Sequence, residues 1–246
     1  MTNDLPALLK QDTIVESYLE IRFEHNQVGE IVLGRLAAVS DWNGYQSQRL
    51  PFSDLPQSIR DSDINLRFEP ILQLQDPRGQ EVVKIGPRVL SLHRLGGYPG
   101  WSKFFDRQKG MISGLWATVP GLEIARIGLR YINALLPSHG FNSFWDMNLK
   151  VEVDGDRPAE TMAANYRFPA GVNCMVQVGV AHPTYVNGPL IPGSVALVDI
   201  DVFTPQQVGS TTEQIVLQWV EDAHKAEKQA FFKLWPEDKL NAQRVK

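Results

Sequence analysis

An eleven-residue alternation of side chains over Ile14–Glu24 constrains the fold of this chain more than any other feature. One set of alternate positions is largely apolar and the other set is polar. The first set is Val15, Ser17, Leu19, Ile21 and Phe23, and the second is Glu16, Tyr18, Glu20, Arg22 and Glu24. Successive side chains of a strand point to opposite faces of its sheet, so this segment is expected to be a half-buried strand.

Similar patterns predict most of the remaining elements. Further strands are expected at Ile64–Gln75, Glu81–Ile85, Arg88–Arg94, Glu123–Leu136, Leu149–Val153, Met162–Phe168, Val172–Ala181 and Val195–Thr204. Apolar residues at three- and four-residue steps predict helices at Val28–Val39, Ser102–Val119 and Thr211–Trp235. Ser210 and Glu213 have the spacing of a capping box at the start of the last helix. The polar segment Ser40–Asp63, which contains Pro51 and Pro56, is expected to be a long loop.

The order of these elements predicts an α+β fold. Strands joined by short turns favour antiparallel pairing, because a parallel pair needs a longer crossover. Both halves of the chain, 1–137 and 138–246, run through strands to one aromatic-rich helix. We therefore expect mainly antiparallel sheet with the two long helices on one face, in two similar halves that form one compact unit.

Composition narrows the classes of partner and compartment. The chain has 246 residues with 24 basic and 28 acidic side chains, a formal charge of −4, which disfavours a dedicated binder of duplex DNA. Its single cysteine, Cys174, precludes an intrachain disulfide and falls in an apolar alternation that predicts burial. Prolines and glycines interrupt the weakly charged stretch Phe168–Val198, so no membrane-spanning helix fits there. Met1–Asp12 lacks the apolar core of a signal peptide. We expect a cytoplasmic protein without membrane contact.

No cofactor is expected from the motifs. The segment Gly96–Gly100 lacks the spacing of a dinucleotide-binding loop, and neither a phosphate-binding loop nor a G-x-S-x-G nucleophile elbow occurs. The five histidines lie far apart in sequence, without a helical pair at i, i+4, which disfavours a zinc site.

Arginines within the predicted strands are the first candidate binding residues. They are Arg22, Arg67, Arg88, Arg94, Arg126 and Arg130. Clustered guanidiniums can hold a phosphate or carboxylate in bidentate fashion. The alternative is a structural ladder of opposite charges on neighbouring strands. Because these arginines outnumber the strand acids in the first half, we predict that they do not all find acidic partners within the chain.

Two further features carry competing interpretations. Asp199 and Asp201, at i and i+2 on one strand face, can share a divalent cation, or they can form a solvated strand end. Tyr98 and Trp101 belong to an aromatic loop ahead of a helix, which either binds a partner or forms a hydrophobic staple for that helix.

The segment Arg126-Ile127-Gly128-Leu129-Arg130-Tyr131-Ile132-Asn133 resembles the central signature of a sporadically distributed prokaryotic family of uncharacterised proteins. The resemblance extends to three other parts of the chain. These are the strand Glu20–Phe23, the strand Leu90–Leu92 before a Trp/Phe helix, and the late helix with His224-Lys225-Ala226 that ends near Phe232. The patchy distribution of that family is similar to that of toxin–antitoxin and phage-defence genes, and the resemblance implies no catalytic residues.

Two functions remain open. The first is a non-catalytic, antitoxin-like accessory protein that holds a protein partner, or a second copy of itself, on the arginine-bearing face or the aromatic loops. The second is a nucleotide- or phosphate-handling enzyme or sensor with Asp199 and Asp201 as a divalent-metal site. The absence of a local catalytic constellation favours binding.

Overall fold

The computed structural model describes residues 5–64, 66–152, 162–171, 173–183 and 191–245. Within them, nine strands form one sheet in the order β2-β3-β4-β5-β1-β6-β9-β8-β7, and every neighbouring pair is antiparallel. The strands are β1 (Ile14–Glu24), β2 (Gln46–Arg49), β3 (Leu72–Gln75), β4 (Glu81–Gly86), β5 (Val89–Leu95), β6 (Glu123–Leu135), β7 (Ala163–Pro169), β8 (Met175–Ala181) and β9 (Ala196–Phe203). The expected antiparallel α+β fold is confirmed.

The sheet contains the same strand order twice. One group runs β3-β4-β5-β1 and the other runs β7-β8-β9-β6, and the groups meet where β1 pairs with β6. In each group a long helix follows the strand next to the central one: α3 (Trp101–Thr118) follows β5, and α4 (Glu213–Lys233) follows β9. The division of the chain at residue 137 stays a prediction, and β6, which lies before that point, is the central strand of the second group.

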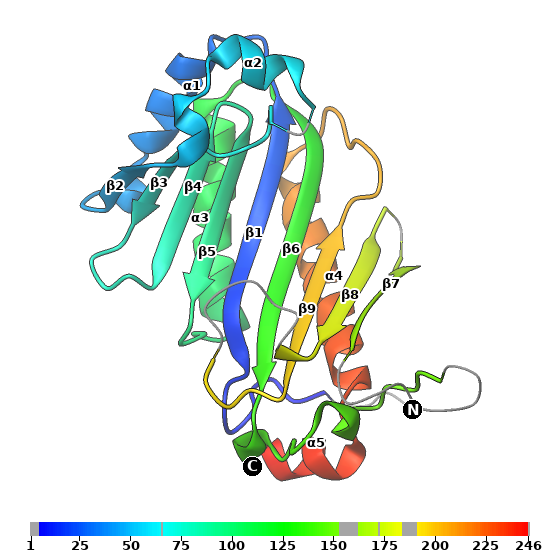
Figure 1. Ribbon diagram of the computed structural model, residues 1–246. Coiled ribbons are helices and arrows are strands. Elements are labelled where there is room, and N and C mark those ends of the chain that lie inside the picture. Colours follow the sequence, from blue (N-terminus) through cyan, green and yellow to red (C-terminus); the bar gives the residue numbers. More distant parts are fainter. Residues whose placement is uncertain (1–4, 65, 153–161, 172, 184–190, 246) are drawn as a thin grey trace.

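The long helices cover one face of the sheet (Figure 1). α3 packs against β5, α4 packs against β6, β8 and β9, and α1 (Gly29–Ala37) packs against α3 and β4. Between these layers Ser17, Leu19, Ile21 and Phe23 of β1 are fully buried, and the core also takes in inward-facing residues of β4, β5, β6, β8 and β9. The short helices α2 (Gln57–Ser62) and α5 (Glu237–Gln243) lie at the ends of the sheet (Figure 1). Among the described residues, no helix has the length and apolar character that crossing a membrane requires.

Three predicted segments differ from the structure. The strand expected over Ile64–Gln75 is confined to β3, because Pro70 has no N–H to donate and the residues before it fold into turns, with the Arg67 N–H bonded to the Asp63 carbonyl. The expected loop Ser40–Asp63 instead contains β2, two 3₁₀ turns (Ser40–Trp42 and Pro51–Asp54) and α2. Its prolines stand at helix starts, where a missing N–H costs nothing.

The strand expected over Leu149–Val153 is not formed at residues 149–152, and Val153 lies outside the described residues. The backbone there is held by other partners, since the Asn148 N–H donates to the Leu234 carbonyl. The start of α4 also differs. Thr212, rather than Ser210, accepts a helix N–H, that of Ile215, at 3.4 Å. Glu213 instead accepts a hydrogen bond from the Ser113 hydroxyl and so links α4 to α3.

Two glycines give a matched test of the packing. A methyl group at Gly86 would lie 2.8 Å from the Glu69 carbonyl oxygen and 2.8 Å from Val89 Cγ1, whereas one at Gly34, exposed in α1, would meet nothing within 4 Å. We expect Gly86→Ala to lower the free energy of unfolding by about 1–3 kcal/mol through overpacking. Gly34→Ala should raise it by about 0.5–1 kcal/mol, because alanine loses less backbone entropy in a helix. Urea unfolding measures both, and an unchanged midpoint for Gly86→Ala would contradict the packing of residues 69–70 on β4.

Candidate functional site

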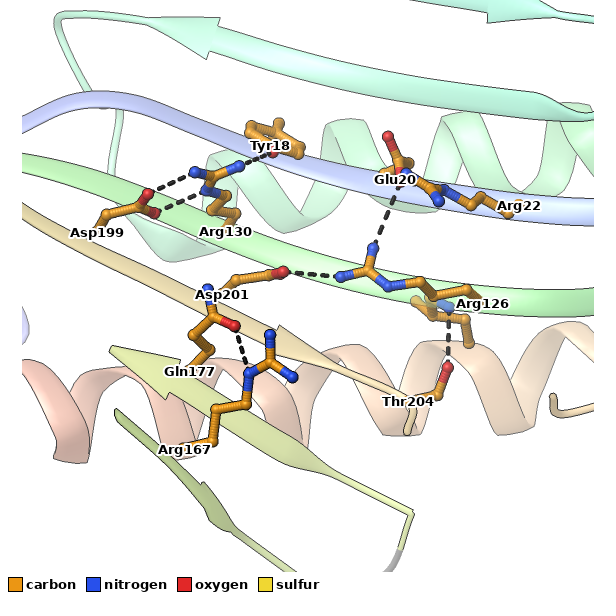
Figure 2. A network of polar contacts seen from close by, with 11 residues as sticks. Tyr18, Glu20, Arg22, Arg126, Arg130, Arg167, Gln177, Asp199, Asp201 and Thr204 are labelled. Atoms are coloured by element: carbon orange, nitrogen blue, oxygen red, sulfur yellow. Dashed lines mark hydrogen bonds and ion pairs between the residues drawn. The ribbon is translucent and has the colours of Figure 1, made fainter. Parts of the chain in front are cut away.

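Polar side chains of five neighbouring strands meet on the helix-free face of the sheet (Figure 2). We call them the open-face network; its members are Tyr18, Glu20, Arg22, Arg126, Arg130, Arg167, Gln177, Asp199 and Asp201. The strand register places Arg130 of β6 opposite Tyr18 of β1 on one side and opposite Asp201 of β9 on the other. Gln177 of β8 is in turn paired with Asp201 and with Arg167 of β7. The sheet thus aligns side chains that are up to 183 residues apart in sequence, from Tyr18 to Asp201.

Arg126 joins β1 to β9. Its Nη2 donates to Asp201 Oδ2 at 2.7 Å, and its Nη1 lies 3.4 Å from Glu20 Oε1. The same Glu20 oxygen accepts a hydrogen bond from Arg22 Nε at 2.7 Å. The Arg126 guanidinium also lies over the ring of Phe203, 4.9 Å from its centroid. One guanidinium therefore contacts two carboxylates and an aromatic ring.

Arg130 makes a second, parallel link. Its Nε donates to Asp199 Oδ1 at 2.7 Å and its Nη2 binds Asp199 Oδ2, which is the bidentate geometry that guanidinium and carboxylate favour. Its Nη1 donates to the Tyr18 hydroxyl at 2.9 Å. The contact with Asp199 raises the pKa of Arg130, so this cation stays charged at any physiological pH.

Gly128 lies between these two arginines on the same face of β6. A Cβ atom there would be 2.5 Å from Arg126 Nη1, so a larger residue would push the Arg126 guanidinium away from the position in which it reaches Glu20 and Asp201. The open-face network therefore explains the Arg-x-Gly-x-Arg spacing. Two long side chains share one face of the strand, and the residue between them has no side chain.

The open-face network is partly shielded from water although no helix covers it. The side chain of Arg126 is 26 % exposed and that of Asp201 is 20 % exposed. Burial raises the pKa of Asp201 above its ordinary value, against the opposing effect of Arg126 and Arg130. The groups are held in place by one another before any partner is present.

Three of the predicted arginines, Arg67, Arg88 and Arg94, do not belong to the open-face network. Arg67 and Arg88 both bind Glu24, with Arg67 at 3.0 Å; Arg67 so connects the turns before β3, and Arg88 the β4–β5 turn, to the end of β1. In the part of the chain described, Arg94 donates to the carbonyl oxygens of Gly96 and Gly97 and to Gln80 rather than to a carboxylate. These three arginines stabilise turns. The prediction that not all six pair with acids therefore agrees with the contacts of Arg94.

Asp199 and Asp201 do share one strand face, as expected. Each, however, accepts hydrogen bonds from a guanidinium, and the described residues contain no group of three or more His, Cys, Asp or Glu side chains placed to hold a metal ion. Their geometry assigns them to arginine binding. Cys174 is buried as predicted, and burial raises the pKa of its thiol to about 11.

Tyr98 and Trp101 lie apart from the arginines, on the helix-covered face. The ring of Trp101, at the start of α3, stacks on His224 of α4 with centroids 3.8 Å apart and on Phe105 at 5.0 Å. The Tyr98 hydroxyl lies 3.2 Å from that of Tyr131 on β6. The structure therefore divides the predicted binding residues between two places.

Several members of the open-face network were not predicted as binding residues. Tyr18 and Glu20 lie on the polar side of the β1 alternation together with Arg22, which was a usable signal. Arg167 and Gln177, whose side chains bond at 2.6 Å, could not be connected to the arginines because strand order is not readable from one sequence.

Removing Arg126 tests whether the open-face network is an energetically coupled unit. Arg126→Ala leaves Glu20 and Asp201 without their shared cation. We therefore expect the free energy of unfolding to fall by roughly 1–3 kcal/mol, a value between those for exposed and for buried ion pairs. The loss should shrink as the pH falls through the raised pKa of Asp201, because a protonated Asp201 no longer pairs with the Arg126 cation. Lys225→Ala is the control, because its pair with Asp222 is mostly exposed; it should change stability by less than about 0.5 kcal/mol. Equal effects of the two substitutions in urea unfolding would contradict the coupling.

Comparisons with known proteins identify no family. No protein-family model matches the chain, and no curated protein matches it. Among solved structures, it is similar to the substrate-free duplicated taurocyamine kinase from Schistosoma mansoni, with 10 % identity and a TM-score of 0.39 over 90 % of this chain and 33 % of that chain. TBP from Methanococcus jannaschii shows 14 % identity and a TM-score of 0.29, covering 94 % and 99 % of the two chains. This chain spans about one third of the kinase chain, and likenesses this low carry no argument about function.

Proposed function

We propose that this protein works by binding, as a non-catalytic accessory protein that holds a protein partner on the open-face network. We propose further, on the resemblance of the Arg126–Asn133 segment to a sporadically distributed prokaryotic family, that it acts in a defence or toxin–antitoxin type of system. The observation that carries it is the fixed alternation of guanidinium and carboxylate groups on a sheet face that the long helices leave open (Figures 1 and 2).

Preorganisation supports binding at this surface. Ordering long side chains costs free energy when a complex forms, and arginines already held by carboxylates have met that cost in the free protein. Arginine and aromatic side chains are enriched in protein interfaces. Here the ring of Phe203 lies beneath the Arg126 guanidinium, and the Arg167 guanidinium lies 5.9 Å from the centroid of the same ring. The open-face network thus offers a polar, semi-rigid surface with an apolar ring at its centre.

The charge pattern favours a protein over a phosphate-bearing ligand. A phosphate approaching Arg126 or Arg130 would have to displace Asp201 or Asp199, and the displaced carboxylate would repel it. A protein surface with its own alternating charges can instead pair with both signs at once, which gives specificity. The alternative function, a phosphate-handling enzyme or sensor with a divalent cation at Asp199 and Asp201, requires both acids to leave their arginines.

Exchanging the two charges of one ion pair tests whether the open-face network binds a partner, as distinct from stabilising the fold. The double variant Arg130→Asp, Asp199→Arg keeps an ion pair at the same place but reverses its polarity, and Arg78→Ala, in the exposed β3–β4 turn, is the control. We expect wild type and Arg78→Ala to co-purify the same partner from cells of the source organism, and the swap to reduce its recovery at least tenfold while circular dichroism shows that the variant remains folded. Quantitative mass spectrometry measures recovery.

Two results would contradict the proposal. One is full recovery of the partner by the charge-swapped protein. The other is a rise in melting temperature with Mg²⁺ and a nucleotide that Asp199→Asn, Asp201→Asn abolishes, since this would indicate the metal-dependent alternative. Size-exclusion chromatography identifies the case in which the partner is a second copy of the chain.

A further inference from the structure

A cavity of about 290 Å³ lies on the other face of the sheet, remote from the open-face network. Its walls come from the N-terminal segment 6–14, the start of α3, the inner side of β6 and the middle of α4. Its volume is at the lower end of the range of small-molecule sites, about 300–1,000 Å³. The cavity is therefore of a size that suits a small organic molecule.

Aromatic rings form much of its wall. Tyr98, Trp101, Tyr131 and His224 all line it. Trp101 is stacked on His224, Tyr131 lies edge-on to Tyr98 with centroids 5.8 Å apart, and the hydroxyls of the two tyrosines are within hydrogen-bond distance. Such walls stabilise an apolar body, and ring faces attract cations.

Two buried polar side chains also line the cavity. Glu227 of α4 is 5 % exposed, and its Oε2 lies 3.9 Å from His224 Nδ1. Asn133 of β6 is 1 % exposed; its Oδ1 accepts a hydrogen bond from the Thr13 hydroxyl at 2.8 Å, while its Nδ2 has no hydrogen-bond partner among the described residues. The lining of one partly enclosed space thus includes a buried carboxyl residue and a buried amide residue.

His224 does not neutralise Glu227. Burial lowers the pKa of His224 to about 4, so at neutral pH its ring is uncharged. Burial also raises the pKa of Glu227 to about 8, although nearby Lys228 opposes the shift. Lys228 itself donates to the Leu5 carbonyl at 3.3 Å. In the free protein, Glu227 is therefore a carboxyl group poised to ionise when a suitable cation arrives.

We propose that this cavity binds a small organic amine, whose cationic nitrogen pairs with Glu227 while its apolar body lies among Tyr98, Trp101 and Phe232. The site is independent of the open-face network, so either proposal can fail without the other.

The proposal predicts proton release on binding. Glu227 must lose its proton to pair with an ammonium group, so affinity should rise with pH up to about 8. The other titratable groups around the cavity are His224 and Lys228 on α4, Tyr98 before α3, Tyr131 on β6, and Lys10 and Asp12 in the N-terminal segment. Burial raises the pKa values of both tyrosines, and His224 titrates near pH 4, so these three do not change charge in this range.

Calorimetry on the full chain tests the site with small primary amines and alcohols of the same skeleton, represented by phenethylamine and phenethyl alcohol. We expect the amine to bind at least tenfold more tightly than the alcohol at pH 7.5. Glu227→Gln should remove that preference, and Glu221→Gln, on the same helix outside the cavity, should retain it. Equal affinity for the two probes, binding unaffected by Glu227→Gln, or no binding by any amine would overturn the proposal.

A second measurement does not depend on the variant. Repeating the wild-type titration in buffers of different ionisation enthalpy counts protons, and we expect release approaching one proton per amine bound at pH 7. No release would contradict pairing with Glu227.

The pH dependence of stability gives a further prediction. The folded-state pKa of Glu227 is raised, so its contribution to stability is full below the ordinary value of 4.5 and is lost as pH rises towards about 8. We therefore expect the melting temperature of wild type to fall relative to that of Glu227→Gln between pH 5 and about 8, measured by circular dichroism. Parallel curves would show that Glu227 is not protonated in the free protein.

Discussion

The antiparallel pairing of β1 with β6 is the interaction on which the rest of this structure depends. These two long strands are adjacent in the sheet, with β5, β4, β3 and β2 beyond β1 and with β9, β8 and β7 beyond β6. Their register places Leu19 opposite Leu129 and Ile21 opposite Ile127 on the helix-covered side. The same register sets Tyr18 against Arg130 on the open side. Because side chains alternate between the faces, a slip of one strand by one residue would turn the core-facing side chains of that strand to the open face.

Because β6 is a strand, the short motif Arg126–Asn133 contributes side chains to both faces of the sheet. Arg126, Gly128 and Arg130 point to the open face, where they build the open-face network. Tyr131 and Asn133, only a few residues further on, point to the helix-covered face and line the cavity. A motif of eight residues thus supplies part of the open-face network and part of the wall of a cavity.

Much of the fold was readable from the sequence, and the reasons are local. The alternation in β1 and the helical spacing in α3 and α4 reflect burial of one side of each element, which a single sequence records directly. The turns around Pro70 were missed because alternation continues across a residue that cannot donate to a neighbouring strand. The arginines and aspartates were recognised as candidates, but their partners were not, since Arg130 and Asp199 meet only through the pairing of β6 with β9. The cavity was invisible for the same reason: its Glu227 reads as one more polar position on an amphipathic helix.

A nine-stranded sheet that does not close on itself has two unpaired edges, and the sequence of each edge restricts how this protein can associate. β2 has only four residues, all polar and all exposed, and β7 ends at Pro169, which has no N–H to offer another strand. Short polar edge strands and edge prolines discourage edge-to-edge assembly and aggregation. In the part of the chain that the structure describes, β2 and the Pro169 end of β7 are therefore poor templates for addition of another strand.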